Sequence, residues 1–154
     1  MIQRIQTLFL LLSLICTSMF FFFPFAEFID STGEISANID IMGIHFSDGS
    51  AAKNISTISV LILILIINLV TFISIFTYKK RMLQMRFSFF NIILQIGSIA
   101  LIVYCSIQTS KNIEMDLLLG FLVTLPFVAA ILTFLAIRAI GKDELLVRSI
   151  NRIR

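Results

Sequence analysis

Residues Ile55–Tyr78 read ISTISVLILILIINLVTFISIFTY, a stretch without a single charged side chain. About 20 apolar residues in helical conformation cross the hydrocarbon core of a bilayer, which is about 30 Å thick. Three further apolar stretches occur at residues 6–28, 87–108 and 115–137. The composition is accordingly 58% hydrophobic and only 14% charged, outside the range of soluble domains. The sequence therefore predicts four transmembrane helices.

These stretches predict an all-α membrane protein that forms a single domain over residues 1–154. Its fold class is a four-transmembrane-helix antiparallel bundle, because the short connections at 79–86 and 109–114 make successive helices neighbours. The remaining segments are a long outer loop at 29–54 and a cytoplasmic tail at 138–154.

The lysines and arginines predict the orientation. With both termini in the cytoplasm, ten of the twelve basic residues lie inside, and only Lys53 and Lys111 lie outside. The bias of Lys and Arg toward the cytoplasmic helix ends sets membrane topology. Because these basic residues flank the spans, we expect contact with anionic lipid headgroups and no nucleic-acid binding.

The outer loop carries a strand pattern. Apolar residues alternate with polar ones over 35–41, which is typical of a half-buried strand. Gly43 permits a turn before the apolar pair Ile44 and Phe46, and residues 47–50 predict a second turn. A small β-hairpin over the outer end of the bundle would bury the isoleucines.

The tail predicts a separate amphipathic helix. Gly141 can end the fourth span, and Asp143 can cap a new helix. That helix would lie at the membrane surface, or dock a cytosolic partner or the 79–86 loop. Its candidate contact residues are Lys142, Leu146, Arg148, Ile150, Arg152, Ile153 and Arg154.

Each helix also has a small or polar face, through which helices pack in lipid. The face of the third helix consists of Ser88, Asn91, Gln95, Ser98, Cys105 and Ser106. The first helix contributes Gln6, Ser13, Cys16, Thr17 and Pro24. The fourth contributes Pro126, Ala129, Thr133 and Ala136.

The candidate intramembrane polar contacts are Asn68, Asn91, Gln95 and Ser98. Asn68 and Gln95 can reach a similar depth, about 15 and 12 Å from the inner edge of the bilayer. Their interpretation is either an interhelical hydrogen bond or a polar binding site. Pro126 is expected to kink the fourth helix.

We expect no enzymatic activity, and no catalytic, cofactor-binding or metal-binding residue is assigned. No ionisable residue lies in the middle of a span, where proton relays and ion paths place one. Both cysteines fall inside spans, and His45 is the only histidine. A lipid-modifying enzyme would have to use Glu27, Asp30 and His45, which the pattern favours least.

Three blocks carry a family resemblance: MIQRIQT at the start, KKRMLQMR at 79–86 and LAIRAIGKDELLVRSINRIR at the end. Together they resemble a four-span membrane protein family of Bacteroidetes, a domain of unknown function. The resemblance implies a multi-pass protein of the bacterial inner (cytoplasmic) membrane with both termini cytoplasmic. It implies no activity and no site residues.

Two functions remain open. The first is a non-enzymatic accessory or scaffold subunit that binds membrane or cytosolic proteins. The alternative is a small oligomeric transporter or channel, with the polar face of the third helix lining a path.

The topology can be tested with reporter fusions. Fusions within residues 1–4, 79–86 and 139–154 should report the cytoplasm, and fusions within 30–53 the outside, because the basic residues hold the inner segments. An external signal from 79–86 would overturn the whole orientation.

Overall fold

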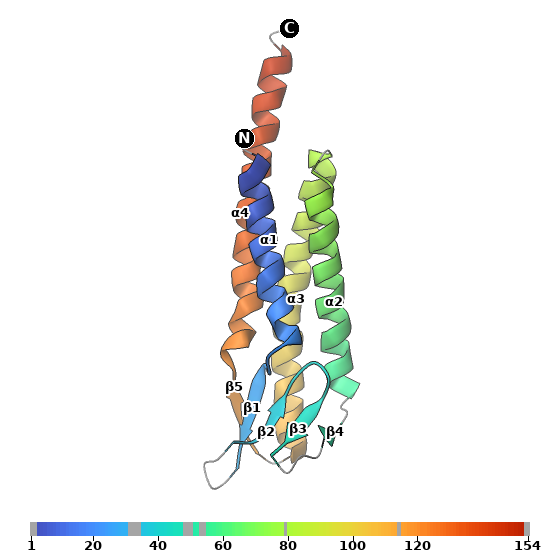
Figure 1. The fold of residues 1–154 in the computed structure, drawn as a ribbon, viewed down its shortest axis with the longest axis vertical. Coiled ribbons are helices and arrows are strands. Elements are labelled where there is room, and N and C mark those ends of the chain that lie inside the picture. Colours follow the sequence, from blue (N-terminus) through green and yellow to red (C-terminus); the bar gives the residue numbers. More distant parts are fainter. Residues whose placement is uncertain are drawn as a thin grey trace.

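The computed structural model describes residues 3–30, 35–47, 51–52, 55–78, 80–113 and 115–152. Within these residues the chain forms four α-helices, two 3-10 turns and one small β-sheet. The helices are α1 (Gln3–Ser18), α2 (Ile55–Phe76), α3 (Arg81–Ile113) and α4 (Leu125–Arg152). The helices run alternately up and down, and the sheet closes one end of the bundle (Figure 1).

The helices form a ring in which α1 contacts α2 and α4, and α3 contacts α2 and α4. This confirms a mostly helical fold with antiparallel neighbours. Three segments are long and apolar enough to cross a membrane, namely Thr57–Phe76, Arg81–Ile113 and Phe121–Leu145. The first helix contributes the shorter apolar segment Ile5–Phe21.

The sheet is larger than the predicted hairpin. Its strands are β1 (Ala26–Ile29), β2 (Ile35–Ile39), β3 (Ile44–Phe46), β4 (Ala51–Ala52) and β5 (Asp116–Leu119). Their order is β4-β3-β2-β1-β5, and every pairing is antiparallel. The predicted pair of strands at 35–41 and 44–46 is present as β2 and β3. Most of the second predicted turn, residues 48–50, lies outside the described residues.

Two predicted spans were too long because they included strands. The first helix ends at Ser18, with a 3-10 turn η1 (Met19–Phe21), and β1 follows. Pro24 therefore lies outside the helix; proline lacks the amide hydrogen, and the residue before it avoids helical geometry. The predicted fourth span starts with β5 and the 3-10 turn η2 (Phe121–Thr124). Short apolar runs do not distinguish strand from helix by periodicity.

Pro126 was wrongly predicted to kink a span. It is the second residue of α4, where the first-turn amides have no helical partner and proline costs nothing. The predicted break at Gly141 is also wrong, because α4 continues to Arg152. No separate tail helix forms in the described residues; Ile153 and Arg154 lie outside them, as do the side chains of Leu146, Arg148, Ile150 and Arg152.

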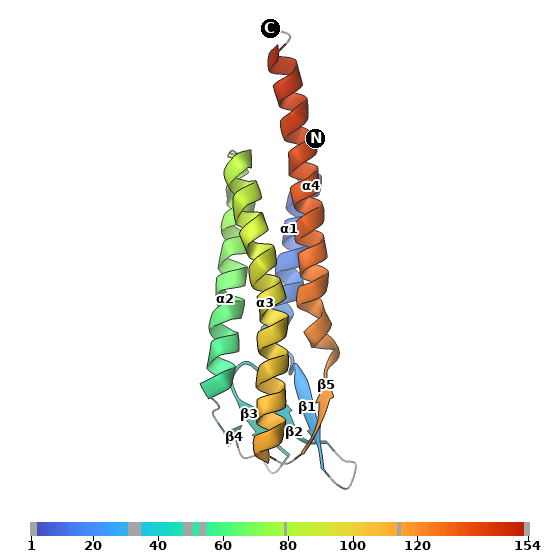
Figure 2. The ribbon, with the colours of Figure 1, turned by 180° about the vertical axis from the view of Figure 1, so that it is seen from behind.

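The third helix is longer than predicted and supports the sheet. Its 33 residues extend about 50 Å at about 1.5 Å per residue. Its C-terminal part lies against the sheet end (Figure 2) and contacts β5 and η2. One apolar cluster there joins Phe28 and Ile39 of the sheet to Ile64 of α2 and Ile102 of α3.

Gly120, directly after β5, permits a close approach to Phe25, directly before β1. Its amide donates to the Phe25 carbonyl at 3.1 Å, just before β1 pairs with β5. A Cβ at this position would lie 2.9 Å from the Phe25 carbonyl oxygen. Any side chain therefore pushes the two segments apart.

Replacing Gly120 with Ala should lower the free energy of unfolding by about 1–3 kcal/mol, the usual cost of overpacking. Thermal unfolding of the purified protein measures the change. Gly97→Ala is the matched control, because a Cβ there meets nothing within 4 Å and alanine favours a helix. Equal stability of the two variants would contradict the close-approach role of Gly120.

Candidate functional site

Many polar side chains lie in the interior of the helix bundle, among buried apolar ones. The buried face of α3 consists of Gln84, Ser88, Asn91, Gln95, Ser98, Ile102, Cys105, Ser106 and Thr109. Their spacing of mostly three and four residues keeps them on one side of a helix. The predicted polar face of the third helix is thus buried within the bundle, with Gln95 fully inaccessible and Asn91 and Ser98 1% exposed.

Gln95 joins three helices at one level. Its amide nitrogen donates to Ser13 Oγ of α1 at 3.0 Å, and its amide oxygen lies 3.3 Å from Thr133 Oγ1 of α4. The two hydroxyls lie 3.0 Å apart, and that of Thr133 also donates to the Ala129 carbonyl at 2.8 Å. Gln95 and these hydroxyls are fully buried, so direct hydrogen bonds between side chains hold this level together.

Asn68 uses different partners. Its Oδ1 lies 2.7 Å from Thr17 Oγ1 and 3.4 Å from Ser18 Oγ, both on α1. The structure therefore does not bring Asn68 and Gln95 together: Asn68 meets α1 at Thr17, about one helical turn from Ser13, which Gln95 meets. Depth along a helix leaves its rotation undetermined, and here Asn68 faces α1 from α2.

A second set of bonds joins α2 to α3. Asn91 Nδ2 donates to Thr71 Oγ1 at 2.8 Å, and Thr71 donates on to the Ile67 carbonyl at 2.7 Å. Ser74 and Ser88 lie 2.9 Å apart through their hydroxyls. Among the four predicted contacts, Ser98 differs, since its hydroxyl donates to the carbonyl of Gln95 on its own helix at 2.7 Å.

A polar cluster at the end of the bundle opposite the sheet was not predicted from the sequence. Asp143 is 7% exposed; its carboxylate accepts a hydrogen bond from the Gln6 amide, and its carbonyl accepts one from Arg81 Nη1 at 3.1 Å. Asp143 was interpreted as a helix cap. The signal was available, because Ala129, Thr133, Ala136, Ile140 and Asp143 form one continuous helical stripe.

A family comparison matches this chain almost from end to end. The model of a domain of unknown function (DUF4293) covers residues 2–153. The chain belongs to this family. The resemblance read from the three sequence blocks is thereby confirmed, and the family description names no activity or ligand. None of the curated proteins matches the chain.

Three buried amide atoms of this family member have no hydrogen-bond partner within the described structure: Asn68 Nδ2, Gln84 Oε1 and Asn91 Oδ1. Such atoms cost about 1–3 kcal/mol each when they stay unpaired. Side-chain amides donate and accept hydrogen bonds, but they carry no charge and do not gain or lose a proton near neutral pH. The bundle interior can therefore hold polar atoms in place, but its amides offer no acid or base.

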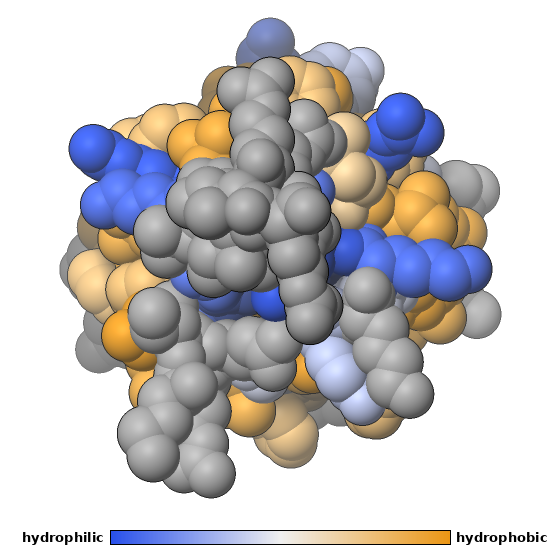
Figure 3. All heavy atoms as spheres, turned by 90° about the horizontal axis from the view of Figure 1, so that it is seen from above, coloured by the Kyte–Doolittle hydropathy of each residue, from blue (hydrophilic) through white to orange (hydrophobic). Residues whose placement is uncertain are grey.

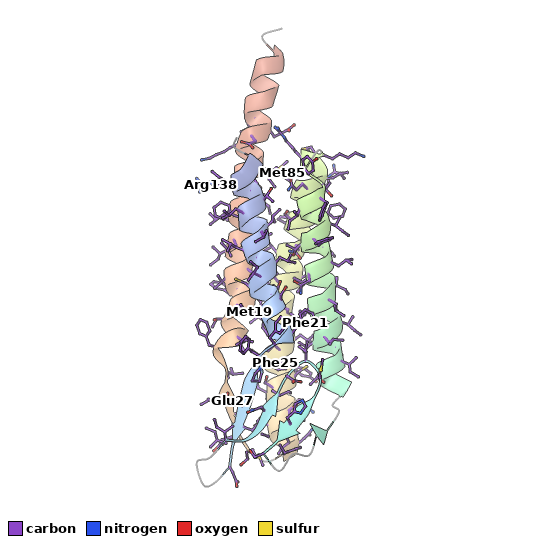
Figure 4. All side chains as sticks on the ribbon, viewed as in Figure 1. Met19, Phe21, Phe25, Glu27, Met85 and Arg138 are labelled. Carbon is purple, nitrogen blue, oxygen red and sulfur yellow. The ribbon has the colours of Figure 1, made fainter. Side chains whose placement is uncertain are left out.

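The other candidate residues lie at the sheet end. Glu27 belongs to β1 rather than to a helix end, as Figure 4 shows. His45 of β3 lies with Nε2 3.3 Å from Asp40 Oδ2, and Asp40 Oδ1 accepts the amides of Met42 and Gly43 in the β2–β3 turn. Within the described residues, no group of three or more potential metal ligands comes together.

Replacing Gln95 with Leu removes the hydrogen bond to Ser13 and the longer contact with the Thr133 hydroxyl at 3.3 Å, while Ser13 and Thr133 keep each other. Such bonds contribute about 0.6 kcal/mol each and seldom more than about 1.7. We expect a loss of about 1 kcal/mol in unfolding free energy, measured in detergent by reversible denaturation. Ile96→Leu is the control, because Ile96 is 56% exposed on the same helix. A loss above about 4 kcal/mol would show that Gln95 does more than join helices.

Proposed function

We propose that this protein is a multi-pass membrane protein of the bacterial cytoplasmic membrane, with both termini inside, that acts as an accessory or scaffold subunit without enzymatic activity. The observation that carries the proposal is the inverted distribution of polarity. Polar groups bond to one another inside the bundle, whereas large apolar side chains cover its outside. Lipid is the solvent that suits such a surface.

The second helix illustrates this surface. Its exposed residues include Ile62, Leu65, Ile66, Leu69, Phe72, Ile73 and Phe76. Its polar residues Thr71 and Ser74 instead point inward and are almost fully buried. The 22 residues of α2 extend about 33 Å, which suits a hydrocarbon core of about 30 Å.

The ends of the bundle support the orientation. Arg81, Arg138 and Lys142 lie at the end where α1 begins and α4 ends, and the sheet lies at the other (Figures 1 and 4). The basic end would face the cytoplasm. The last turns of α4 extend beyond the other helices there (Figure 1), which offers a helix for a protein partner.

A scaffold role predicts a stable partner. The tagged protein, extracted in mild detergent from its own membrane, should purify with another protein at a fixed ratio. Removing residues 146–154 should release that partner and leave the bundle intact, because the buried contacts of α4 end at Asp143 in the described side chains. Arg86→Gln is a control for nonspecific loss of charge. A partner-free protein at every extraction condition would contradict the role.

A transporter or channel is the second candidate function, because three buried amide atoms in the described structure lack a hydrogen-bond partner. Water along Asn68, Gln84 and Asn91 would satisfy them and would form a polar path. Proteoliposomes placed in glycerol or potassium chloride should then swell at a rate that Asn91→Leu abolishes without unfolding the protein. Swelling no faster than that of empty liposomes would exclude this candidate for those solutes.

A further inference from the structure

A hollow of about 280 Å³ opens on the outer side of the α1–α4 contact, near the basic end of the bundle. Its walls are Phe9 of α1 and Leu135, Arg138, Ala139 and Lys142 of α4. Ala139 contributes only a methyl group, so space remains between Phe9 and the two basic side chains. The hollow therefore combines an apolar wall with a cationic rim.

The two cations on this rim lie one helical turn apart and are both exposed. In the part of the chain that the structure describes, neither Arg138 nor Lys142 forms an ion pair. Asp143 follows Lys142 directly, but its carboxylate is buried against Gln6. Like charges four residues apart destabilise a helix, so an anion at this rim would relieve the repulsion. Arg81 differs, because it donates to the Asp143 carbonyl.

Along α4, the lining residues change from apolar to basic toward the end of the bundle. Leu135 lies nearest the middle of the bundle, then come Arg138 and Ala139, and Lys142 lies nearest the end. Figure 4 shows Arg138 extending away from the bundle, and the view from this end shows hydrophilic side chains projecting between apolar ones (Figure 3). A ligand that fits must carry an anionic group toward the end and an apolar chain toward the middle.

We infer that this hollow binds an anionic phospholipid, with the phosphate between Arg138 and Lys142 and an acyl chain along Phe9 and Leu135. The inference rests on the proposed membrane location. Arginine and lysine suit a phosphodiester by charge and hydrogen bonding. Free phosphate would use the rim alone and leave the apolar wall empty.

The test is native mass spectrometry of the full-length protein released from detergent with added lipid. Phosphatidylglycerol should bind as a discrete adduct, and phosphatidylcholine with the same chains should bind far more weakly. The double variant Arg138→Gln/Lys142→Gln should weaken phosphatidylglycerol binding about thirtyfold, from about fivefold for each cation. The matched control Lys80→Gln/Arg86→Gln removes two exposed cations at the same end and should leave binding unchanged.

A second variant tests the apolar wall. Ala139→Leu fills the hollow and keeps both charges, and it should also prevent the discrete adduct. Three results would each overturn the inference. They are equal losses of phosphatidylglycerol binding in the two double variants, equal binding of the two lipids to the unchanged protein, and displacement of the lipid by millimolar inorganic phosphate. Membrane fractionation of the same variants keeps the outcomes distinguishable: a protein that washes off membranes fails the proposed function, whereas one that stays and binds no lipid fails only this site.

Discussion

A buried polar atom costs free energy unless it forms a hydrogen bond, and this constraint determines how the four helices pack. In lipid, where we propose that this bundle lies, the hydrophobic drive that holds helices together in water is absent, and association would depend on close packing and on bonds between helices. Gln95 meets the constraint by joining α1, α3 and α4 at one level, while Asn91 and Ser88 join α3 to α2. Because α3 takes part in both sets, rotating it would break bonds to all three neighbours. The polar stripe of α3 thus fixes its rotation, and the other helices follow from it.

The sheet imposes a second constraint at the opposite end. Strands β1 and β5 come from the two outer connections and pair along their full length, which ties the end of α1 to the start of α4. Because of this pairing, strands take up part of the two apolar runs that contain α1 and α4. The Phe25–Gly120 contact has no room for a side chain on residue 120. The sheet also explains the length of α3, whose last turns supply Ile102 and Cys105 to the apolar cluster beneath the sheet. The interior therefore changes character along its axis, from hydrogen-bonded in the bundle to apolar under the sheet.

Sequence periodicity predicted the parts of this structure that depend on one face of one element. The polar face of α3 and the β2–β3 pair were readable because a period of 3.6 or 2 identifies which residues share a face. The strands β1 and β5 could not be predicted in this way, since their apolar residues continue the hydrophobic runs of α1 and α4. Only the pairing of the two segments makes them strands. The Asn68–Gln95 pairing failed for a related reason: depth follows from counting residues, whereas the partner depends on helix rotation. The burial of Asp143 was not predictable from Gly141, which is typical of a helix end; in the structure α4 and its buried stripe continue past this glycine.

At the contact between α1 and α4, the buried polar interior lies next to the exposed cationic rim of the hollow. Lys142 and Asp143 are neighbours in sequence, but about 100° of helical rotation separates their side chains. Asp143 points inward and accepts a hydrogen bond from the Gln6 amide. Lys142 points outward and lines the hollow together with Phe9. The same two helices thus bury a carboxylate on one side, and on the other carry two cations that have no ion pair among the described residues. A phospholipid with its phosphate at the rim and its acyl chain along Phe9 would bridge α4 to α1 and reinforce the contact that Gln6 and Asp143 make inside. Lipid composition and helix packing would then be coupled through one pair of helices.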